Sequence, residues 1–285
     1  MSGVQWWYMT RGVLVPTDGS PLSRDALEHA LTAYPDGDVV LLHVVDPRYT
    51  SYDDDELHPD RIFEKLTELV DRRGVESETA VRVGHPKREI VEYSERDGID
   101  EVVMGSHGRD RASRILLGSV AETVLRRAPV PVTLVRTHQR TGEHHLAVAT
   151  DGSPQARDAL EYALSTFPDA EITVVHAIDP METHYGDGQL VHTEAEYEEI
   201  EAESEELFDE ERAIAEEYGV EIRTATAVGT DPNVPARTLL EYVDDHDVDH
   251  VVMGSHGRTG VTRVLLGSVA ETVARRSPAP VTVVR

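Results

Sequence analysis

Two copies of one glycine-bearing segment carry the clearest chemistry in this sequence. The first copy reads Val-Val-Met-Gly-Ser-His-Gly over residues 102–108, and Gly118-Ser119 follows after nine further residues. The second copy has the same letters over residues 251–257, with Gly267-Ser268 at the same spacing. Glycines let backbone N–H groups approach a ligand closely, and the N-terminus of a helix adds a partial positive charge. Each copy therefore has the composition of a phosphate-binding cradle.

Side chains near these glycines allow more than one role. His107 and His256 are candidates for general acid–base chemistry, but no acidic neighbour, nucleophile or metal-ligand spacing accompanies either. A polar loop contact is therefore favoured for both. Four loop arginines either neutralise phosphate or lie on the surface, and residue type does not decide between these roles. They are Arg109, Arg114, Arg258 and Arg263.

Short apolar runs that alternate with helical patterns must position the glycine segments. In the first half, strands are predicted at residues 12–18, 39–45, 79–83, 101–104 and 132–135. Helices are predicted at residues 61–73, 87–96 and 119–127, and another starts at Pro21 with Ser20 as its N-cap. Because each strand reads as apolar throughout, we expect a parallel, doubly wound sheet.

Ser119 and Ser268 stand at the start of the helix that follows each glycine segment. Each precedes a glutamate, Glu122 or Glu271, by three residues, which is the spacing of a capping box. The same hydroxyl can cap an empty helix and bind phosphate when a ligand is present. With glycines on both sides, the phosphate role is favoured.

The second half repeats the first, with sixteen extra residues between the early and late motifs. Twelve of them precede Gly229 and feed a glutamate-rich helix at about residues 194–217, with Tyr197, Ile200, Leu207, Ala213 and Ile214 facing inward. A solvated helix face is favoured over a docking site for a basic partner.

We expect an N-terminal extension (1–10), a first domain (11–137), a linker (138–144) and a second domain (145–285). The expected fold is α/β, with two tandem doubly wound domains, each a five-stranded parallel sheet with helices on both faces.

Composition narrows the classes of function. The chain has 54 acidic and 27 basic residues, a net charge of −27, and only two lysines, Lys65 and Lys87. This charge disfavours nucleic-acid binding and is typical of a protein in a salt-rich cytoplasm, where ions screen the self-repulsion. The absence of cysteine excludes disulfides and thiolate metal sites. No apolar run has the length of a membrane span and no signal peptide is recognisable, so we expect a cytoplasmic protein.

The repeated pattern resembles the nucleotide-binding signature of the universal stress protein family. The pattern is an aspartate after the first strand, then G-x-x-G, nine residues and G-S, and it occurs twice over nearly the whole chain. On residue type alone, Asp18 and Asp151 could simply begin turns. The resemblance implies an ATP-binding fold, with the nucleotide at the carboxyl ends of the strands and possible Mg²⁺ or Mn²⁺.

The resemblance also implies a set of site residues. Asp18 would contact the ribose side, Val44 the adenine, and the loop glycines with Ser119 and Val120 the phosphates. The first set is Pro16, Thr17, Asp18, Val44, Met104, Gly105, His107, Gly108, Arg109, Gly118, Ser119 and Val120. The second set is Thr150, Asp151, Ala177, Met253, Gly254, His256, Gly257, Arg258, Gly267, Ser268 and Val269. The smaller Ala177 would loosen adenine packing in the second site. Asp110 would weaken phosphate binding in the first site unless Arg111 offsets its charge.

Three functions fit these observations. A regulatory ATP-binding protein is favoured, because the chain lacks a Walker loop, a lysine near either motif and a base to position water. The alternatives are an ATP-hydrolysing or adenylyl-transferring enzyme on the same fold, and a structural pseudo-dimer that has lost nucleotide binding. In the resembling family the fifth strands pair two domains, so the two halves could form that pair within one chain. Further homodimerisation is compatible with this arrangement.

Overall fold

The computed structural model describes residues 10–48, 58–108, 117–136, 145–178, 194–229, 235–257 and 266–285, with side chains in the glutamate-rich helix from residue 202 onward. Several predicted features lie outside these ranges: nearly all of the N-terminal extension, the linker and the four loop arginines. The arginines concerned are Arg109, Arg114, Arg258 and Arg263.

Each half of the chain alternates strands and helices in the predicted order. The first half comprises β1 (Gly12–Thr17), α1 (Pro21–Ala33), β2 (Asp38–Val45), α2 (Pro59–Arg73), β3 (Ser77–Val83), α3 (Pro86–Ser94), β4 (Glu101–Gly105), α4 (Ser119–Arg127) and β5 (Val132–Val135). The second half comprises β6 (His145–Thr150), α5 (Pro154–Thr166), β7 (Glu171–Ile178), α6 (Glu194–Tyr218), β8 (Ile222–Val228), α7 (Pro235–Asp245), β9 (His250–Gly254), α8 (Ser268–Arg276) and β10 (Val281–Val284).

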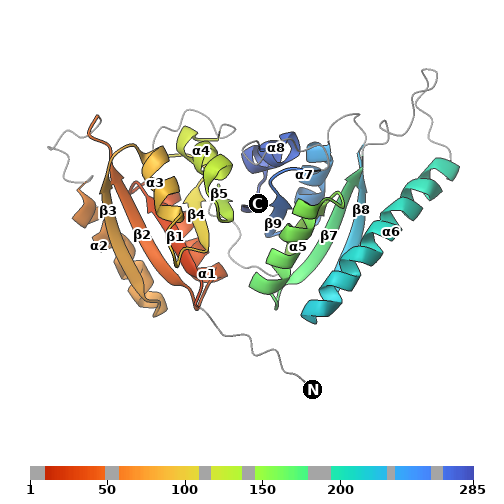
Figure 1. Cartoon of the computed structure of the whole chain (residues 1–285), viewed down its shortest axis with the longest axis horizontal. Helices are drawn as coiled ribbons and strands as arrows, with labels where there is room; N and C mark the ends of the chain where they lie inside the picture. Colours follow the sequence, from red (N-terminus) through yellow and green to blue (C-terminus); the bar gives the residue numbers. More distant parts are fainter. Residues whose placement is uncertain are drawn as a thin grey trace.

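The ten strands form one sheet in the order β3-β2-β1-β4-β5-β10-β9-β6-β7-β8. Strands within each half are parallel, and the two halves meet where β5 pairs antiparallel with β10. Figure 1 shows the two halves side by side, with β5 and the C-terminus between them. The predicted α/β class with tandem parallel sheets is therefore confirmed, and the two sheets continue into each other.

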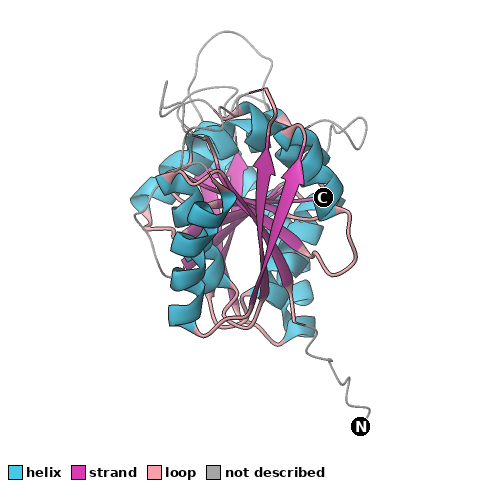
Figure 2. Ribbon diagram, turned by 90° about the vertical axis from the view of Figure 1, so that its left-hand side faces the viewer, coloured by secondary structure: helices cyan, strands magenta, loops and turns pink. Residues whose placement is uncertain are grey.

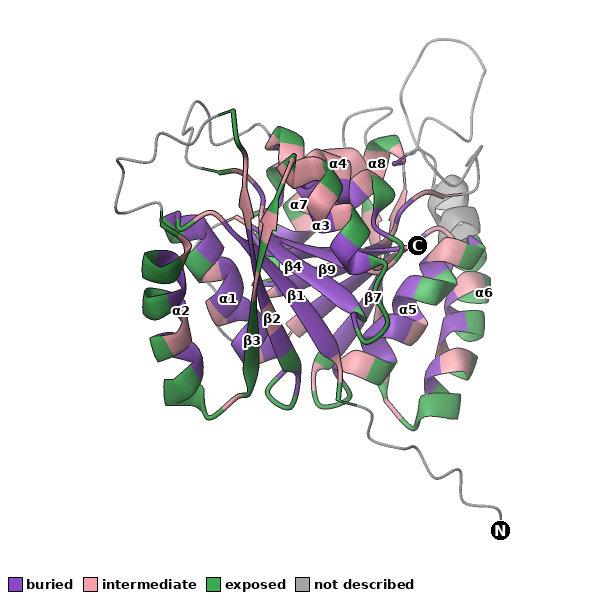
Figure 3. Cartoon of the chain, turned by 60° about the vertical axis from the view of Figure 1, so that its left-hand side comes forward, coloured by how far each residue is buried: buried purple, intermediate pink, exposed green. Residues whose placement is uncertain are grey.

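Helices cover both faces of the sheet, as Figure 2 shows. One face packs against α1 and α2 in the first half and α5 and α6 in the second. The other face packs against α3, α4, α7 and α8. Successive residues of β1 serve both layers, because Val13 and Val15 join the first cluster and Leu14 joins the second. The central strands are buried almost completely (Figure 3).

The outermost strands, β3 and β8, differ from the prediction. They are not buried on both faces: Val81 and Val83 of β3 are 48% and 69% exposed, and Val228 of β8 is 38% exposed. Both strands lie at the edges of the sheet, where a strand needs much less burial than a central one. The expectation that every strand is apolar throughout is therefore wrong for these two.

The glutamate-rich helix α6 forms as predicted but presents a different face to the core. Its buried positions are Ser204, Phe208, Glu211 and Ala215, which lie on one helical face. Leu207 and Ile214 are only half-buried, and Ala213 is exposed, so the predicted inward stripe is partly wrong. The predicted Tyr197 and Ile200 lie outside the described side chains. Among the described residues no helix is both long and apolar enough to span a membrane.

Candidate phosphate-binding sites

The topology brings the predicted site residues of each half to one edge of the sheet. In the first half β1 lies between β2 and β4, so the chain reverses its direction of travel across the sheet between β1 and β4. Ligands of doubly wound proteins bind at the carboxyl ends of strands beside such a switch point. Asp18 follows β1 and the loop at residues 106–108 follows β4, so both lie at this point. Asp151 and residues 255–257 have the same relation in the second half.

Asp18 both begins a turn and faces the glycine loop. Its Oδ1 accepts a 3.0 Å hydrogen bond from the backbone N–H of Ser20, which caps α1. Its Oδ2 lies so close to Gly108 that a Cβ on this glycine would approach it to 3.0 Å. In the second half Asp151 binds Ser153 N–H in the same way, and a Cβ on Gly257 would overlap its Oδ2. The turn role is therefore confirmed, and it leaves the carboxylate beside the loop.

Gly118 closes the loop onto the start of α4. Its N–H donates a 2.7 Å hydrogen bond to the carbonyl of Ser106. A Cβ at this position would come within 3.0 Å of His107 Cα and 3.2 Å of Ser106 O, so a side chain would push against the loop backbone. Gly267 has the same relation to His256, at 3.2 Å. Both glycines therefore allow a close backbone approach at a helix N-terminus.

The predicted capping boxes do not form. The N-cap of α4 is Gly118 and that of α8 is Gly267, so each serine is the first residue inside its helix. The glutamate then stands one position too far along to reach back to the cap, and its backbone N–H binds the glycine carbonyl instead. Ser119 and Ser268 are exposed at the first helical position. Their hydroxyls therefore lie beside the N-terminal N–H groups of the helices.

Gly105 and Gly254 have a packing role that the sequence did not reveal. A Cβ on Gly105 would lie 2.9 Å from Leu22 Cγ at the start of α1. A Cβ on Gly254 would lie 2.7 Å from the carbonyl oxygen of Gln155 in α5. Close approach of a helix to a strand end explains these two glycines without a ligand.

One face of the sheet gathers the apolar members of each predicted site. Met104 is buried in the cluster under α3 and α4, and Val44 and Val120 pack against the same cluster. The second half places Met253, Ala177 and Val269 equivalently. Pro16 and Thr17 are also buried, while Val44 and Ala177 are half-buried at the ends of β2 and β7. The residues expected near adenine and those expected near phosphate thus lie on one side of the sheet.

His107 and His256 make polar contacts within their loops. His107 Nδ1 lies 3.1 Å from Ser106 Oγ, and His256 Nδ1 lies 3.0 Å from Ser255 Oγ. Burial lowers the pKa of His107, and the neighbouring Arg136 lowers it further, against a smaller opposing effect of Asp18. His107 is therefore neutral at physiological pH, which fits the favoured loop-contact role.

Arg136 and Arg285 are functional candidates that lie outside the sequence motif. Arg136 follows β5, lies near enough to His107 to affect its pKa, and donates to the carbonyl of Ala274 in α8 at 3.5 Å. Arg285 follows β10 and donates to the carbonyl of Leu125 in α4 at 2.9 Å. Each arginine thus reaches from the end of its own half to a helix of the other. The repeated Val-Arg pair at the end of both fifth strands is the signal that identifies them.

The helices that start at the two glycine loops are joined by ion pairs. Arg126 of α4 lies 2.8 Å from Glu271 of α8, and Arg275 of α8 lies 4.0 Å from Glu122 of α4. The pairs within each helix, Arg126–Glu122 and Arg275–Glu271, complete a four-residue cluster. The glutamates predicted to cap the helices serve this cluster instead.

The two sites differ beneath the strand that carries the aspartate. In both halves the carbonyl of the threonine before the aspartate lies near a histidine Nδ1, at 2.8 Å for Thr17 and His43 and at 2.9 Å for Thr150 and His176. The hydroxyl partners differ: the hydroxyl of Thr17 lies 3.0 Å from that of Ser23. In the second half Thr150 donates a 2.7 Å hydrogen bond to Glu211 of α6. Glu211 is buried, and this burial raises its pKa. The second site therefore rests on a buried acid that the first site lacks. In the described part of the chain, no cluster of three acidic or histidine side chains could hold a metal ion.

These features define a two-part α/β protein of the doubly wound class, with a glycine loop and a helix N-terminus at the switch point of each half. Residues 9–136 and residues 143–285 each match the universal stress protein family. The chain therefore belongs to the universal stress protein family, as the repeated motif predicted.

Relatives of known sequence and structure match either the whole chain or about half of it. A universal stress protein of Mycolicibacterium smegmatis is 28% identical over 294 residues, which cover 96% of this chain and 97% of the relative. One of Methanocaldococcus jannaschii is 33% identical over 158 residues, or 51% of this chain and 86% of that protein. The crystal structure of a universal stress protein from Archaeoglobus fulgidus matches 98% of this chain and 99% of its own, with a TM-score of 0.69 and 27% identity.

Proposed function

We propose that this protein binds ATP at its two switch-point sites and that the occupied state acts as a regulatory signal in a stress response. The observation that carries the proposal is the close approach of Gly108 to Asp18 and of Gly118 to His107 at the start of α4. These approaches leave backbone and a helix N-terminus, rather than side chains, at the edge of the loop. Such a surface is suited to phosphate.

Each part of the nucleotide has residues suited to it. The N-terminal N–H groups of α4, with the exposed Ser119, would hold phosphate, and Asp18 would receive the ribose hydroxyls. Val44 would line the adenine, on the same face of the sheet as α4. The second half supplies Ser268, Asp151 and Ala177 in these roles. Arg136 lies near enough to His107 to lower its pKa and would add a positive charge beside the first loop, and Arg285, at the equivalent position, would do so in the second half.

Slow turnover follows from the chemistry of the loops. His107 is neutral, contacts Ser106 and lies beside a cation, so it is a weak base for activating water. Neither glycine segment contains a lysine that could clamp the transferred phosphoryl group. The residues present would bind and orient ATP without a placed base. Occupancy would then outlast the time of a typical enzymatic turnover.

A single experiment separates this function from an enzyme and from a structural protein. Purified protein in excess is incubated with ATP, and retained nucleotide and released phosphate are followed together. Retention with ATP intact for minutes to hours supports the proposal. Release of γ-phosphate at about one per second, typical of enzymes, with loss of that rate in His107→Ala, would favour the enzyme. Absence of retained nucleotide would favour a purely structural role.

The arrangement of the halves completes the proposal. We take residues 11–137 and 145–285 as the two domains and 138–144 as their linker, and the halves as an intramolecular pseudo-dimer. Support comes from the β5–β10 pairing, in which Thr133 and Thr282 stand opposite each other. The net charge of −27 supports a salt-rich cytoplasm as the working environment.

A further inference from the structure

The junction between β5 and β10 contains a row of buried polar side chains. Thr133 and Thr282 are directly opposite each other in the antiparallel pair, and their hydroxyls lie 2.5 Å apart. On one side Thr133 lies 2.6 Å from Glu101 of β4, and on the other Thr282 lies 2.7 Å from His250 of β9. All four residues are buried, so the row joins an acid of the first half to a histidine of the second.

With Glu101 ionised, the hydrogens of this row can be placed in only one way. Thr133 donates its only hydroxyl hydrogen to Glu101, so the hydrogen between the two threonines comes from Thr282. The hydroxyl hydrogen of Thr282 is then used, and His250 Nε2 must donate to it. The row therefore runs from a donor in the second half to an acceptor in the first.

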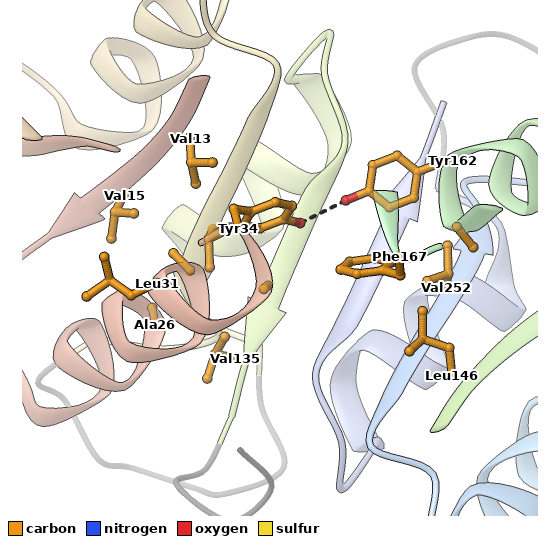
Figure 4. Close-up of a cluster of buried hydrophobic side chains, with 14 of the residues drawn as sticks. Val13, Val15, Ala26, Leu31, Tyr34, Val135, Leu146, Tyr162, Phe167 and Val252 are labelled. Carbon is orange, nitrogen blue, oxygen red and sulfur yellow. Dashed lines mark hydrogen bonds between the residues drawn. The ribbon is translucent and has the colours of Figure 1, made fainter. Parts of the chain in front are cut away.

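Residues from the α1 and α5 regions give Glu101 and His250, at the two ends of the row, different neighbours. Tyr162 of α5 donates to the second carboxylate oxygen of Glu101. The hydroxyl of Tyr34 lies 2.8 Å from that of Tyr162, and Figure 4 shows the two rings pointing toward each other from the two halves. On the other side, the ring of His29 of α1 lies 5.2 Å from that of His250. The acid thus meets a hydroxyl donor, and the histidine meets a second histidine.

The contacting residues occupy equivalent positions in the two halves. In the sequence repeat Glu101 corresponds to His250, Thr133 to Thr282, and His29 to Tyr162. A pair of two first halves would set two Thr133 hydroxyls together, each already donating to its own Glu101. No hydrogen would remain for that contact, and each of the two buried carboxylates would meet His29 in place of the Tyr162 hydroxyl. A first half is therefore complementary to a second half and not to another first half.

We propose that the β5–β10 junction is a heterotypic interaction surface, on which the first half accepts a second half as its partner and rejects another first half. The recognition chemistry is a buried carboxylate acceptor on one side and an imidazole N–H donor on the other. This inference does not depend on nucleotide binding.

One substitution gives the full chain the acid-to-acid row that two first halves would have. His250→Glu replaces the donor to Thr282 with a second buried carboxylate, which leaves no hydrogen for the contact between the two threonines. We expect the equilibrium constant for folding at pH 7.5 to fall roughly 100-fold or more. Glu101→His with His250→Glu reverses the direction of the row and places the new acid against His29. This double variant should regain most of the loss, as measured by urea unfolding of wild type, both single variants and the double variant.

A pH series separates charge from packing. Groups facing the acids are Arg11, 3.5 Å from Glu101, with Tyr34, Tyr162 and His29. The loss in His250→Glu should shrink toward pH 5, because one of the two acids can then take a proton, whereas a packing defect would not respond. As a control, Glu171→His, at an exposed position that starts β7, should change stability less than threefold.

The proposal is overturned if His250→Glu unfolds within threefold of wild type at pH 7.5. It is also overturned if the double variant loses as much folding free energy as the two single variants lose together. If His250→Glu does not fold at all, a folded double variant supports the proposal, and a double variant that also fails to fold overturns it.

Discussion

Thr150 donates a 2.7 Å hydrogen bond to Glu211, an acid buried between α6 and β6. The equivalent Thr17 instead lies 3.0 Å from the hydroxyl of Ser23. The second half has Ala156 in place of Ser23, so it lacks that hydroxyl. The two halves therefore satisfy the same threonine in different ways, and only the second half buries an acid to do so.

This difference predicts a pH-dependent stability. Burial raises the pKa of Glu211, against opposing effects of Thr150 and Arg157. A raised folded-state pKa means that the stability contributed by this acid is present below its unfolded pKa and is lost as pH rises through the folded value. Glu211→Leu with Ala156→Ser copies Leu66 and Ser23 of the first half. It should stabilise the protein by about 1–4 kcal/mol at pH 8.

The gain should shrink at pH 4.5, where wild-type Glu211 is protonated when folded. Urea unfolding of wild type and the double variant at both pH values measures it. Glu210 and Asp151 also influence this acid and are unchanged in both proteins, so the difference reports the substituted pair. A gain that is equal at the two pH values would contradict the prediction.

Gly118→Val should remove one nucleotide site. The new side chain would press on His107 Cα, 3.0 Å from the position of Cβ, and displace the loop from α4. We expect the stoichiometry of ATP binding to fall by one, with a stability cost of about 1–3 kcal/mol from overpacking. Gly267→Val is the matched variant in the second half, with His256 in the same relation. Isothermal titration that still finds two sites in both variants would disprove the assignment.

Arg136→Gln should weaken ATP binding at the first site about 10-fold, the scale of one charge-assisted hydrogen bond. Adenosine binding should be unchanged, because adenosine has no phosphate. The pKa of His107 should rise, since Arg136 lowers it in the wild type. Titration calorimetry and NMR of the histidine measure the two effects. Arg72→Gln, on the exposed face of α2, is the control. Equal losses for ATP and adenosine would indicate a packing role only.

Salt should stabilise this protein. The net charge is −27, and the acids of α6 from residue 202 onward are mostly exposed, so their mutual repulsion is weakened by screening. Thermal unfolding followed from 0.1 to 3 M KCl should show a midpoint that rises by several degrees. A midpoint that stays constant or falls over this range would remove the proposed adaptation to a salt-rich cytoplasm.

The order of strands and helices was predictable because local patterns determine it. Ser20 and Pro21, for example, start α1 as expected, with Ser20 accepting from Ser23 N–H. The capping boxes failed because a shift of one residue in the start of α4 changes what Ser119 can reach. Edge strands were misjudged since strand order is a tertiary property.

Contacts between the two halves could not be predicted from local sequence patterns. Glu101 reads in the sequence as the start of a strand, and nothing near it announces Tyr162, sixty-one residues later in the chain. Arg136 is likewise recognised as a site residue only once the fold pairs β5 with β10 and brings this arginine near His107. The repeat does show which positions of the two halves are equivalent. Different residues at equivalent positions were therefore the sequence signal for contacts between the halves.

Covalent connection of the two halves changes how their pairing responds to dilution. Two separate chains that met through strands such as β5 and β10 would come apart as their concentration fell. Here both strands belong to one polypeptide, so each half meets its partner at a local concentration that does not depend on expression level. The paired sheet is thus maintained when the protein is scarce, and each half can acquire its own substitutions without altering the other.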